Sequence, residues 1–222
     1  MALPFTVEQF LAVFARYNQT IWPLQVVAYV LGALALILAC WPRSHGDRIV
    51  AGILALMWLW TGLVYHLVFF VQVNPAAMLF GAAFLCQAGI LAVVGGVQCR
   101  LHFRLKADLS SVVGVAFVAY AMVLYPILGT LQGHGYPSSP SFGVTPCPLT
   151  IFTFGLLFLS KERISWYVLL IPLAWSVVGS TAAVSLGIVE DLGLLVAGIA
   201  SIALLRTPDG RPTVLGHRQR FA

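Results

Sequence analysis

The side chains best suited to bind a ligand are aromatic, imidazole and thiol groups that lie within or beside apolar segments of the chain. A histidine among apolar residues at membrane depth is costly, so His66 is a functional candidate by default. Aromatic rings and hydroxyl groups near it would suit a small polar or aromatic ligand held by stacking and hydrogen bonds. The predicted ligand-binding residues are His66, Tyr65, Trp60, Tyr120, Tyr125, His134, Tyr136 and Cys147.

Each of these residues also has a purely structural interpretation. Intramembrane Tyr and Trp side chains commonly pack or hydrogen-bond between helices, and Tyr136 could be an interfacial anchor. A metal site formed by His66, His134 and Cys147 is chemically possible, because imidazole and thiolate groups suit copper or zinc. No pair of them has ligand spacing within one helix, so we predict neither a metal site nor another cofactor.

The acidic residues argue against most enzyme chemistry. All of them are expected outside the apolar segments or at their ends: Glu8, Asp47, Asp108, Glu162, Glu190, Asp191 and Asp209. This placement argues against proton-coupled pumping and against acid–base or metallohydrolase catalysis. We therefore assign no catalytic residue and favour a role that is not enzymatic.

The elements that must position these residues are membrane helices. The chain is 60% hydrophobic and 9% charged, with a mean hydropathy of +0.96, whereas soluble domains average about 25% charged residues. A helix needs about 20 apolar residues to cross a bilayer. Seven runs approach or exceed this length, the fifth and the last being short. They are residues 21–41, 49–71, 75–97, 109–131, 145–160, 164–186 and 192–205.

These runs predict an all-α fold, a polytopic seven-helix transmembrane bundle in one domain. Residues 1–20 would form an outer amphipathic helix capped by Thr6 and Gln9, either at the membrane interface or packed on the bundle. Residues 21–205 would form the bundle, and residues 206–222 a basic cytoplasmic tail. We expect this tail to be a topology signal at anionic lipid and not a nucleic-acid-binding arm.

Basic residues predict the orientation. With seven helices, all of the 12 Lys and Arg residues except Arg16 fall on one side of the membrane. They are Arg43, Arg48, Arg100, Arg104, Lys106, Lys161, Arg163, Arg206, Arg211, Arg218 and Arg220. Short loops rich in Lys and Arg remain cytoplasmic, so the N-terminus should be outside and the C-terminus cytoplasmic.

A weak internal repeat divides the chain into two halves. WPL at 22–24 corresponds to CPL at 147–149, DRI at 47–49 to ERI at 162–164, and WT at 60–61 to WS at 175–176. The order and orientation fit parallel triplets of helices joined by an inverting fourth helix, a three-plus-one-plus-three plan. Chance similarity between apolar segments is the alternative.

Two resemblances bear on function. The helix count, topology and repeat order resemble those of SWEET sugar transporters and PnuC vitamin transporters, and more distantly the microbial rhodopsins, although the seventh segment has no lysine for retinal. The segments LPFTVEQFLAVFARYNQTIWPLQ, WLWTGLVYHLVFF and GHGYPSSPSFGVTPCPLTIFTFG resemble a bacterial family of multi-pass integral membrane proteins, domain of unknown function family 6064. This resemblance implies the bacterial cytoplasmic (inner) membrane and supplies no activity or site residue.

The leading functional prediction is binding or transport of a small neutral or weakly charged solute through a cavity between the two helix triplets. The alternatives are a non-transporting accessory or sensor subunit and, third, a membrane enzyme that uses Cys147 or His66. A transporter predicts a polar cavity at mid-membrane depth, an accessory subunit a closed core, and an enzyme a histidine within hydrogen-bond reach of Cys147. The predicted partners are the lipid bilayer and a small ligand.

The uncharged stretch 128–155 should supply one wall of the site. Its glycines free the backbone and its prolines oppose regular helix. Irregular backbone at membrane depth must be covered by protein or line a wet cavity. We therefore expect this loop to fold over the outer mouth, with His134 and Tyr136 directed towards His66 and Cys147 at the start of the fifth helix.

Overall fold

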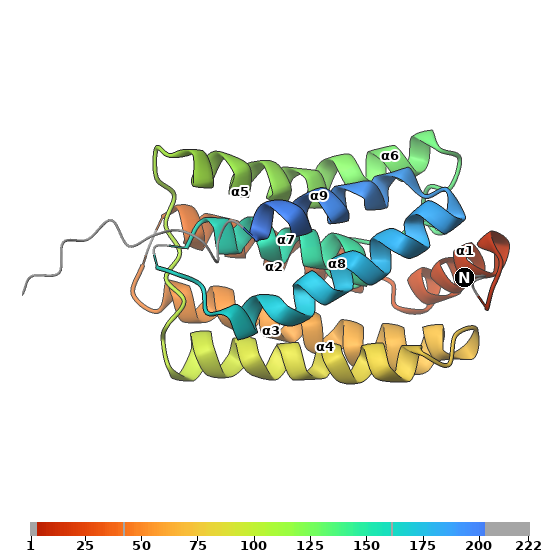
Figure 1. The fold of residues 1–222 in the computed structure, drawn as a ribbon, viewed down its shortest axis with the longest axis horizontal. Helices are drawn as coiled ribbons and strands as arrows, with labels where there is room; N and C mark the ends of the chain where they lie inside the picture. Colours follow the sequence, from red (N-terminus) through yellow and green to blue (C-terminus); the bar gives the residue numbers. More distant parts are fainter. Residues whose placement is uncertain (1–3, 42, 161, 203–222) are drawn as a thin grey trace, which may run out of the picture.

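A computed structural model describes residues 4–41, 43–160 and 162–202, and within them the chain is helical (Figure 1). The α-helices are α1 (Val7–Thr20), α2 (Leu24–Cys40), α3 (Gly46–Trp60), α4 (Ala77–Leu91), α5 (Leu109–Ala119), α6 (Tyr125–Leu131), α7 (Pro146–Phe158), α8 (Trp166–Leu186) and α9 (Leu192–Ser201). The predicted all-α class is therefore confirmed for the described part of the chain.

Several helices continue without a break into tighter or wider turns. π-Helical turns over Thr61–Phe69 and a 3-10 turn over Phe70–Gln72 extend α3, and π-helical turns over Ala92–Val97 extend α4. The π-helical turns Tyr120–Leu124 join α5 to α6, and the 3-10 turn Val189–Asp191 precedes α9. π-Helical turns are rare and frequently lie at functional sites; the longest of them carries two of the predicted binding residues.

Four described helices are long and apolar enough to cross a membrane: Gly46–Gln72, Ala77–Val97, Leu109–Leu131 and Trp166–Leu186. The pair α1 and α2 would supply a fifth span if counted together, although the two helices meet at 86°. By length, α7 and the described part of α9 fall short of a full crossing. The protein is thus a multi-pass membrane protein with four to five spans shown, against the seven predicted.

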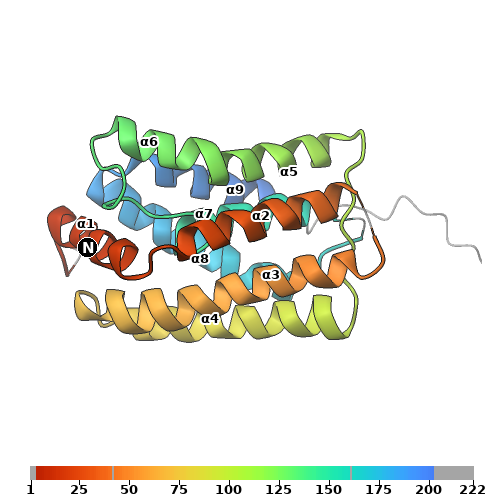
Figure 2. The same cartoon turned by 180° about the vertical axis from the view of Figure 1, so that it is seen from behind.

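Helix α1 begins with the predicted capping box. The backbone N–H of Gln9 donates to the Thr6 hydroxyl at 3.3 Å, and the Thr6 N–H donates to the Gln9 side chain at 2.9 Å. The face that carries Phe10, Phe14 and Tyr17 is buried. Helix α1 therefore packs across one end of the bundle (Figure 2), which supports the second of the two interpretations given to it.

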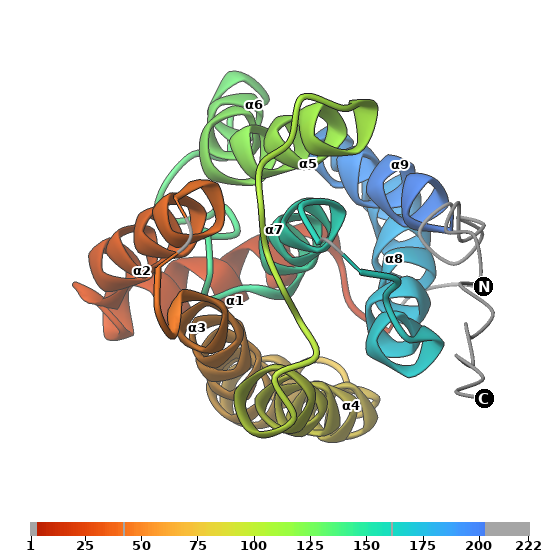
Figure 3. The same ribbon diagram turned by 90° about the vertical axis from the view of Figure 1, so that its left-hand side faces the viewer.

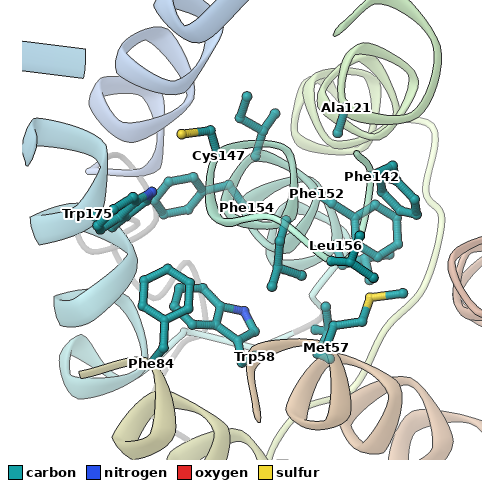
Figure 4. Packing of buried hydrophobic residues seen from close by; sticks show 14 of the residues in the cluster. Met57, Trp58, Phe84, Ala121, Phe142, Cys147, Phe152, Phe154, Leu156 and Trp175 are labelled. Atoms are coloured by element: carbon teal, nitrogen blue, oxygen red, sulfur yellow. The ribbon is translucent and has the colours of Figure 1, made fainter. Parts of the chain in front are cut away.

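Helix α7 is the centre of the molecule. In the end-on view it is surrounded by α2, α3, α4, α8, α9 and α5 (Figure 3). All of its residues are buried, and the aromatic side chains Trp58, Phe84, Phe142 and Trp175 pack around it (Figure 4). This position explains why a short helix without an amphipathic pattern is stable, because every face of it meets protein.

Helices α5 and α7 touch through glycine. A Cβ atom on Gly114 would lie 2.7 Å from the carbonyl oxygen of Gly155, and one on Gly155 would lie 2.8 Å from the carbonyl oxygen of Gly114. Small residues allow this close backbone approach in membrane helix pairs. The crossing therefore depends on both positions having no side chain.

Irregular segments cover both ends of α7. The segment 98–108 crosses the bundle end between α4 and α5 (Figure 3). Its residues Leu101 and Phe103 are buried, and the Arg104 N–H donates to the Leu159 carbonyl at 2.8 Å. At the opposite end, Phe142 and Val144 are buried. The described core is thus closed at both ends of its central helix.

Charge separates the two ends of the bundle. Among the described basic residues, only Arg16 lies at the end that α1 occupies, which we call the α1 end. The others lie at the opposite end, the basic end: Arg43, Arg48, Arg100, Arg104, Lys106 and Arg163. Lys161 and the arginines of the predicted tail lie outside the described residues.

The glycine crossing yields a stability prediction. Replacement of Gly114 or Gly155 by Ala should destabilise the protein by about 1–3 kcal/mol, because the added methyl group overpacks a backbone contact. Thermal unfolding in detergent, followed by far-UV circular dichroism, measures the effect.

The control is Gly89→Ala in α4, where an added Cβ has no heavy atom within 4 Å. It should leave the unfolding temperature unchanged or raise it, because Ala favours a helix by about 1 kcal/mol over Gly. Equal unfolding temperatures for all three variants would contradict the role assigned to the crossing.

Candidate functional site

A cavity of about 360 Å³ that could hold a ligand lies at the α1 end, and we call it the aromatic cavity. It lies between α1, the extension of α3, the beginnings of α4 and α7, and the C-terminal half of α8. Its aromatic lining residues are Phe5, Phe10, Phe14, Tyr65, Phe70, Phe80 and Trp175. A cavity of this volume and composition suits a small, mostly apolar molecule.

The aromatic cavity opens sideways along α8. Val177, Val178 and Thr181 line it and are also exposed on the outer surface of the bundle. Nearer the basic end, α4 and α8 are tied together by the Gln87 amide, which donates to the Val168 carbonyl at 3.0 Å. The exposed lining residues of α8 therefore border the cavity on a surface that would face lipid.

Polar groups are confined to a few points of the cavity wall. Asp191, in the turn between α8 and α9, and Cys147, in the first turn of α7, both contribute to the lining. Trp175 also lines the cavity, and its buried indole N–H has no hydrogen-bond partner within the described residues. The remaining polar lining residues are Asn74, Thr181 and Ser185. A few polar groups in an apolar wall are what orients a ligand in such sites.

His66 lies behind this wall. Its ring is fully buried, and its centroid lies 4.6 Å from that of Phe84 and 5.2 Å from that of Trp175. Neither ring nitrogen has a hydrogen-bond partner in the described chain. His66 therefore contacts the cavity through Trp175 instead of lining it.

A second polar cluster joins the turn before α9 to the chain around α6. The Glu190 carboxylate is bound by the His134 imidazole at 2.8 Å and by the Gln132 amide at 2.7 Å. The Tyr120 hydroxyl donates to the Glu190 backbone carbonyl at 2.7 Å, and the Tyr125 hydroxyl donates to the Asp191 carboxylate. Two buried acids are thereby tied to the π-helical turns after α5, to α6 and to the loop that follows α6.

Burial raises the pKa of Asp191 from 3.8 to about 7. The carboxyl group loses water in the interior, and the nearby Glu190 carboxylate raises its pKa further. Contacts with the Tyr125 hydroxyl, the Cys147 thiol and the more distant His134 act in the opposite direction. Desolvation is the largest of these effects, so near neutral pH the group exists in both protonation states.

The predicted binding residues fall into separate groups. Tyr65 and Cys147 line the aromatic cavity, and His66 lies behind it. Tyr120, Tyr125 and His134 bind the two acids. Trp60 donates to the Tyr17 hydroxyl at 2.9 Å, and Tyr136 is exposed beside Trp22 at the α1 end.

The loop between α6 and α7, residues 132–145, differs in part from its prediction, and we call it the covering loop. Residues 139, 140 and 142–145 are buried against the bundle, and Cys147 lies in the first turn of α7 as expected. The side chains of His134 and Tyr136 do not turn towards His66, because His134 binds Glu190 and Tyr136 lies on the surface. An acid at the start of α9 attracts the imidazole more strongly than the apolar rings around His66.

Sequence reasoning missed Glu190, Asp191 and Trp175 as site residues. The two acids were placed at a helix end, and both are buried there. The available signal was that adjacent acids at the α1 end have no Lys or Arg near them in sequence, so their charges had to be neutralised by protonation or by uncharged partners. The group Cys147, Trp175 and Asp191 forms only through the packing of α7 against α8 and α9.

A family model described as "Family of unknown function (DUF6064)" matches residues 7–213. No curated protein and no solved structure matches the chain. In the described part of the chain, no group of three or more His, Cys, Asp or Glu side chains could hold a metal ion.

The buried carboxyl group predicts a pH-dependent stability. Because its folded pKa is raised, the folded protein retains a proton that the unfolded chain releases between pH 3.8 and about 7. Stability is therefore lost as the pH rises through this window. Asp191→Asn does not titrate there, so its unfolding temperature relative to wild type should increase between about pH 5 and about pH 8.

The comparison isolates the change at position 191, because the rest of the chain is the same in both proteins. Unfolding temperatures measured in the same detergent at both pH values give the result. A difference between variant and wild type that does not change with pH would show that Asp191 does not titrate in this range.

Proposed function

The chain belongs to the DUF6064 family, and we propose that it is a multi-pass membrane protein that binds a small, mainly apolar molecule in the aromatic cavity. The observation that carries this proposal is the cavity itself. It is about 360 Å³ in volume, is lined by aromatic rings and has few polar groups. Such a site favours an uncharged or weakly charged molecule with one hydrogen-bonding group.

The carboxyl group of Asp191 favours a ligand that donates a hydrogen bond. Its carboxyl oxygens accept, and as a carboxylate it has no donor of its own. The Cys147 thiol is only a weak donor, the Trp175 indole N–H is buried, and the Asn74 amide is the other side chain in the lining that can donate an N–H. A hydroxyl or amino group on an aromatic or aliphatic body would find both an acceptor and an apolar surface here.

The sideways opening supports entry from the bilayer. Exposed apolar residues of α8 border the cavity, so a lipid-soluble molecule would reach it without crossing a polar surface. This route differs from the polar, mid-membrane cavity expected of a sugar-type transporter. The proposed ligand class is correspondingly more apolar than the solutes of the transporters whose plan the chain resembles.

We further propose the seven-helix topology in the bacterial cytoplasmic (inner) membrane, with the α1 end outside. The distribution of the described basic residues supports this orientation. In the proposed plan, α2–α4 and α7–α9 are parallel triplets, and the continuous helix of α5 and α6 is the inverting helix. The aromatic cavity would then lie between helices of both triplets, in the outer half of the membrane.

The closed ends of α7 favour a binding or sensing protein as the second candidate function. The segment 98–108 covers α7 at the basic end, and none of its residues lines the aromatic cavity. Transport would require α7 or α8 to move away from this cover. An enzyme that uses Cys147 has less support, because no histidine nitrogen is hydrogen-bonded to its thiol in the described chain.

The topology can be tested with single cysteines at Ser44 and Ala76, both of which are exposed, in a protein whose native cysteines are replaced. A membrane-impermeant maleimide added to intact cells should label position 76 and not position 44. The reverse pattern would show an inverted orientation, and labelling of both would exclude any odd number of crossings between them.

Photolabelling can test the cavity. A bilayer-soluble aryl diazirine should label the peptide 177–186 and residues near Trp175 in vesicles that contain the protein. Ala182→Leu should reduce this labelling because the larger side chain fills the cavity, whereas Val184→Leu, which lies outside the lining, should not. Equal labelling of both variants would place the probe on the outer surface of α8.

Competition can test the donor requirement. 1-Naphthylamine should displace the photolabel at about tenfold lower concentration than naphthalene, because one hydrogen bond to a carboxyl group contributes about 1.5 kcal/mol. The two compounds differ by one amino group. Competition at the same concentration would contradict the role proposed for Asp191 while leaving the cavity as a binding site.

A further inference from the structure

A second pocket, separate from the proposed ligand site, lies between α2 and α6 beneath the loop that precedes α7. It has a volume of about 270 Å³, and we call it the α2–α6 pocket. Its polar lining residues are Gln25, Tyr29, Thr130, Ser139 and Ser141, and its aromatic rim is formed by Trp22 and Tyr136. None of its lining residues carries a charge.

Gln25 lines this pocket and carries a buried, unpaired acceptor. Its amide nitrogen donates to the backbone carbonyl of Asn18 at 2.8 Å. A carbonyl only accepts, so the orientation of the Gln25 amide is fixed and its oxygen Oε1 faces away from Asn18. Gln25 is only 6% exposed, and Oε1 meets no donor within the described residues.

Three hydroxyl groups in the lining already donate their hydrogens within the protein. Tyr29 donates to the Met122 carbonyl at 3.0 Å, and Thr130 donates to the Pro126 carbonyl at 2.9 Å. Ser141 donates to the side-chain oxygen of Asn18 at 2.9 Å. What these groups can still offer is oxygen lone pairs, and the Ser139 hydroxyl can rotate to accept as well.

Aromatic rings complete the recognition surface. The ring centroids of Trp22 and Tyr136 lie 6.5 Å apart, and both side chains are more than half exposed at the mouth of the pocket. Aromatic faces attract cations that lie within about 6 Å of the ring centre. Trp and Tyr at the end of a membrane helix also lie at the depth of lipid headgroups.

From this arrangement we propose that the α2–α6 pocket binds a primary ammonium group. An ammonium has three donors and no acceptor, which matches a wall that offers acceptors and aromatic faces. A carboxylate or phosphate would find few donors. A sugar would find donors for its lone pairs only at Ser139 and at the rim residues Trp22 and Tyr136.

A primary ammonium group can reach this site from two sources. One is the ethanolamine headgroup of a phospholipid in the adjacent leaflet, and the other is a free amine in solution. The recognition chemistry is the same in both cases. The test therefore compares lipids that share acyl chains and differ in headgroup with soluble amines.

The first experiment measures retention of added lipid by delipidated protein in neutral detergent, using native mass spectrometry. Phosphatidylethanolamine should bind about tenfold more tightly than phosphatidylcholine, whose quaternary nitrogen cannot donate hydrogen bonds of ~1.5 kcal/mol. Equal binding of the two phospholipids without stabilisation by ethanolamine, or a neutral sugar-headed lipid that binds as tightly as phosphatidylethanolamine, would overturn the proposal.

Two variants assign the binding to this pocket. Thr130→Val removes one acceptor at constant shape, and Trp22→Leu removes one aromatic face. The matched controls are Thr20→Val, whose hydroxyl makes the same kind of hydrogen bond within α1, and Trp166→Leu, which is 65% exposed compared with 61% for Trp22. Both pocket variants should weaken phosphatidylethanolamine binding at least about threefold, and neither control should.

Soluble amines distinguish a free amine from a lipid headgroup as the source of the ammonium group. Ethanolamine should displace bound phosphatidylethanolamine, whereas tetramethylammonium should not. If ethanolamine raises the unfolding temperature in wild type and not in Thr130→Val, while the two phospholipids bind equally, the ligand is a free amine. If the pocket variants bind phosphatidylethanolamine as wild type does, the ammonium site lies elsewhere and this assignment is wrong.

Discussion

The hydrogen bonds of one buried amide, that of Asn18, hold together the end of the molecule where both cavities lie. Its nitrogen donates to the carbonyls of Pro137 and Ser139 at 2.7 and 2.8 Å, and its oxygen accepts from Ser141 at 2.9 Å. Its backbone carbonyl accepts from Gln25. An amide that is fully buried pays a high cost for any unmade hydrogen bond, so α1, the start of α2 and the covering loop are fixed relative to one another.

The covering loop gains its position from this network and from the acids at the start of α9. His134 and Gln132 bind Glu190 at one end of the loop, and Asn18 binds the carbonyls of its middle. Pro140, in the same loop, lines both the aromatic cavity and the α2–α6 pocket. The two cavities are therefore separate spaces that share a wall, and polar groups of α1 and of the turn before α9 hold this wall in place.

Helix positions could be predicted from the sequence more fully than the site. The run 109–131 coincides with the helix Leu109–Leu131, and 164–186 with Trp166–Leu186 to within two residues, because apolar length is a one-dimensional property. The burial of Asp191 is not such a property. It arises because Tyr125 and Cys147, distant in sequence, provide partners for a carboxyl group at a helix end. The π-helical turns that direct both Tyr65 and His66 inward likewise have no signature in apolar periodicity.

The central position of α7 has a consequence for how the protein is made. All thirteen residues of this helix are buried, and its threonine hydroxyls donate to carbonyls of the same helix. A helix of this length is too short to hold itself across a bilayer, and in the folded protein lipid does not touch it. During synthesis it leaves the ribosome before α8 and α9, which form part of its surroundings. Membrane integration of this chain therefore ends with a step in which α8 and α9 pack around α7, which is made before them. The burial of α7 depends on the completion of these two helices.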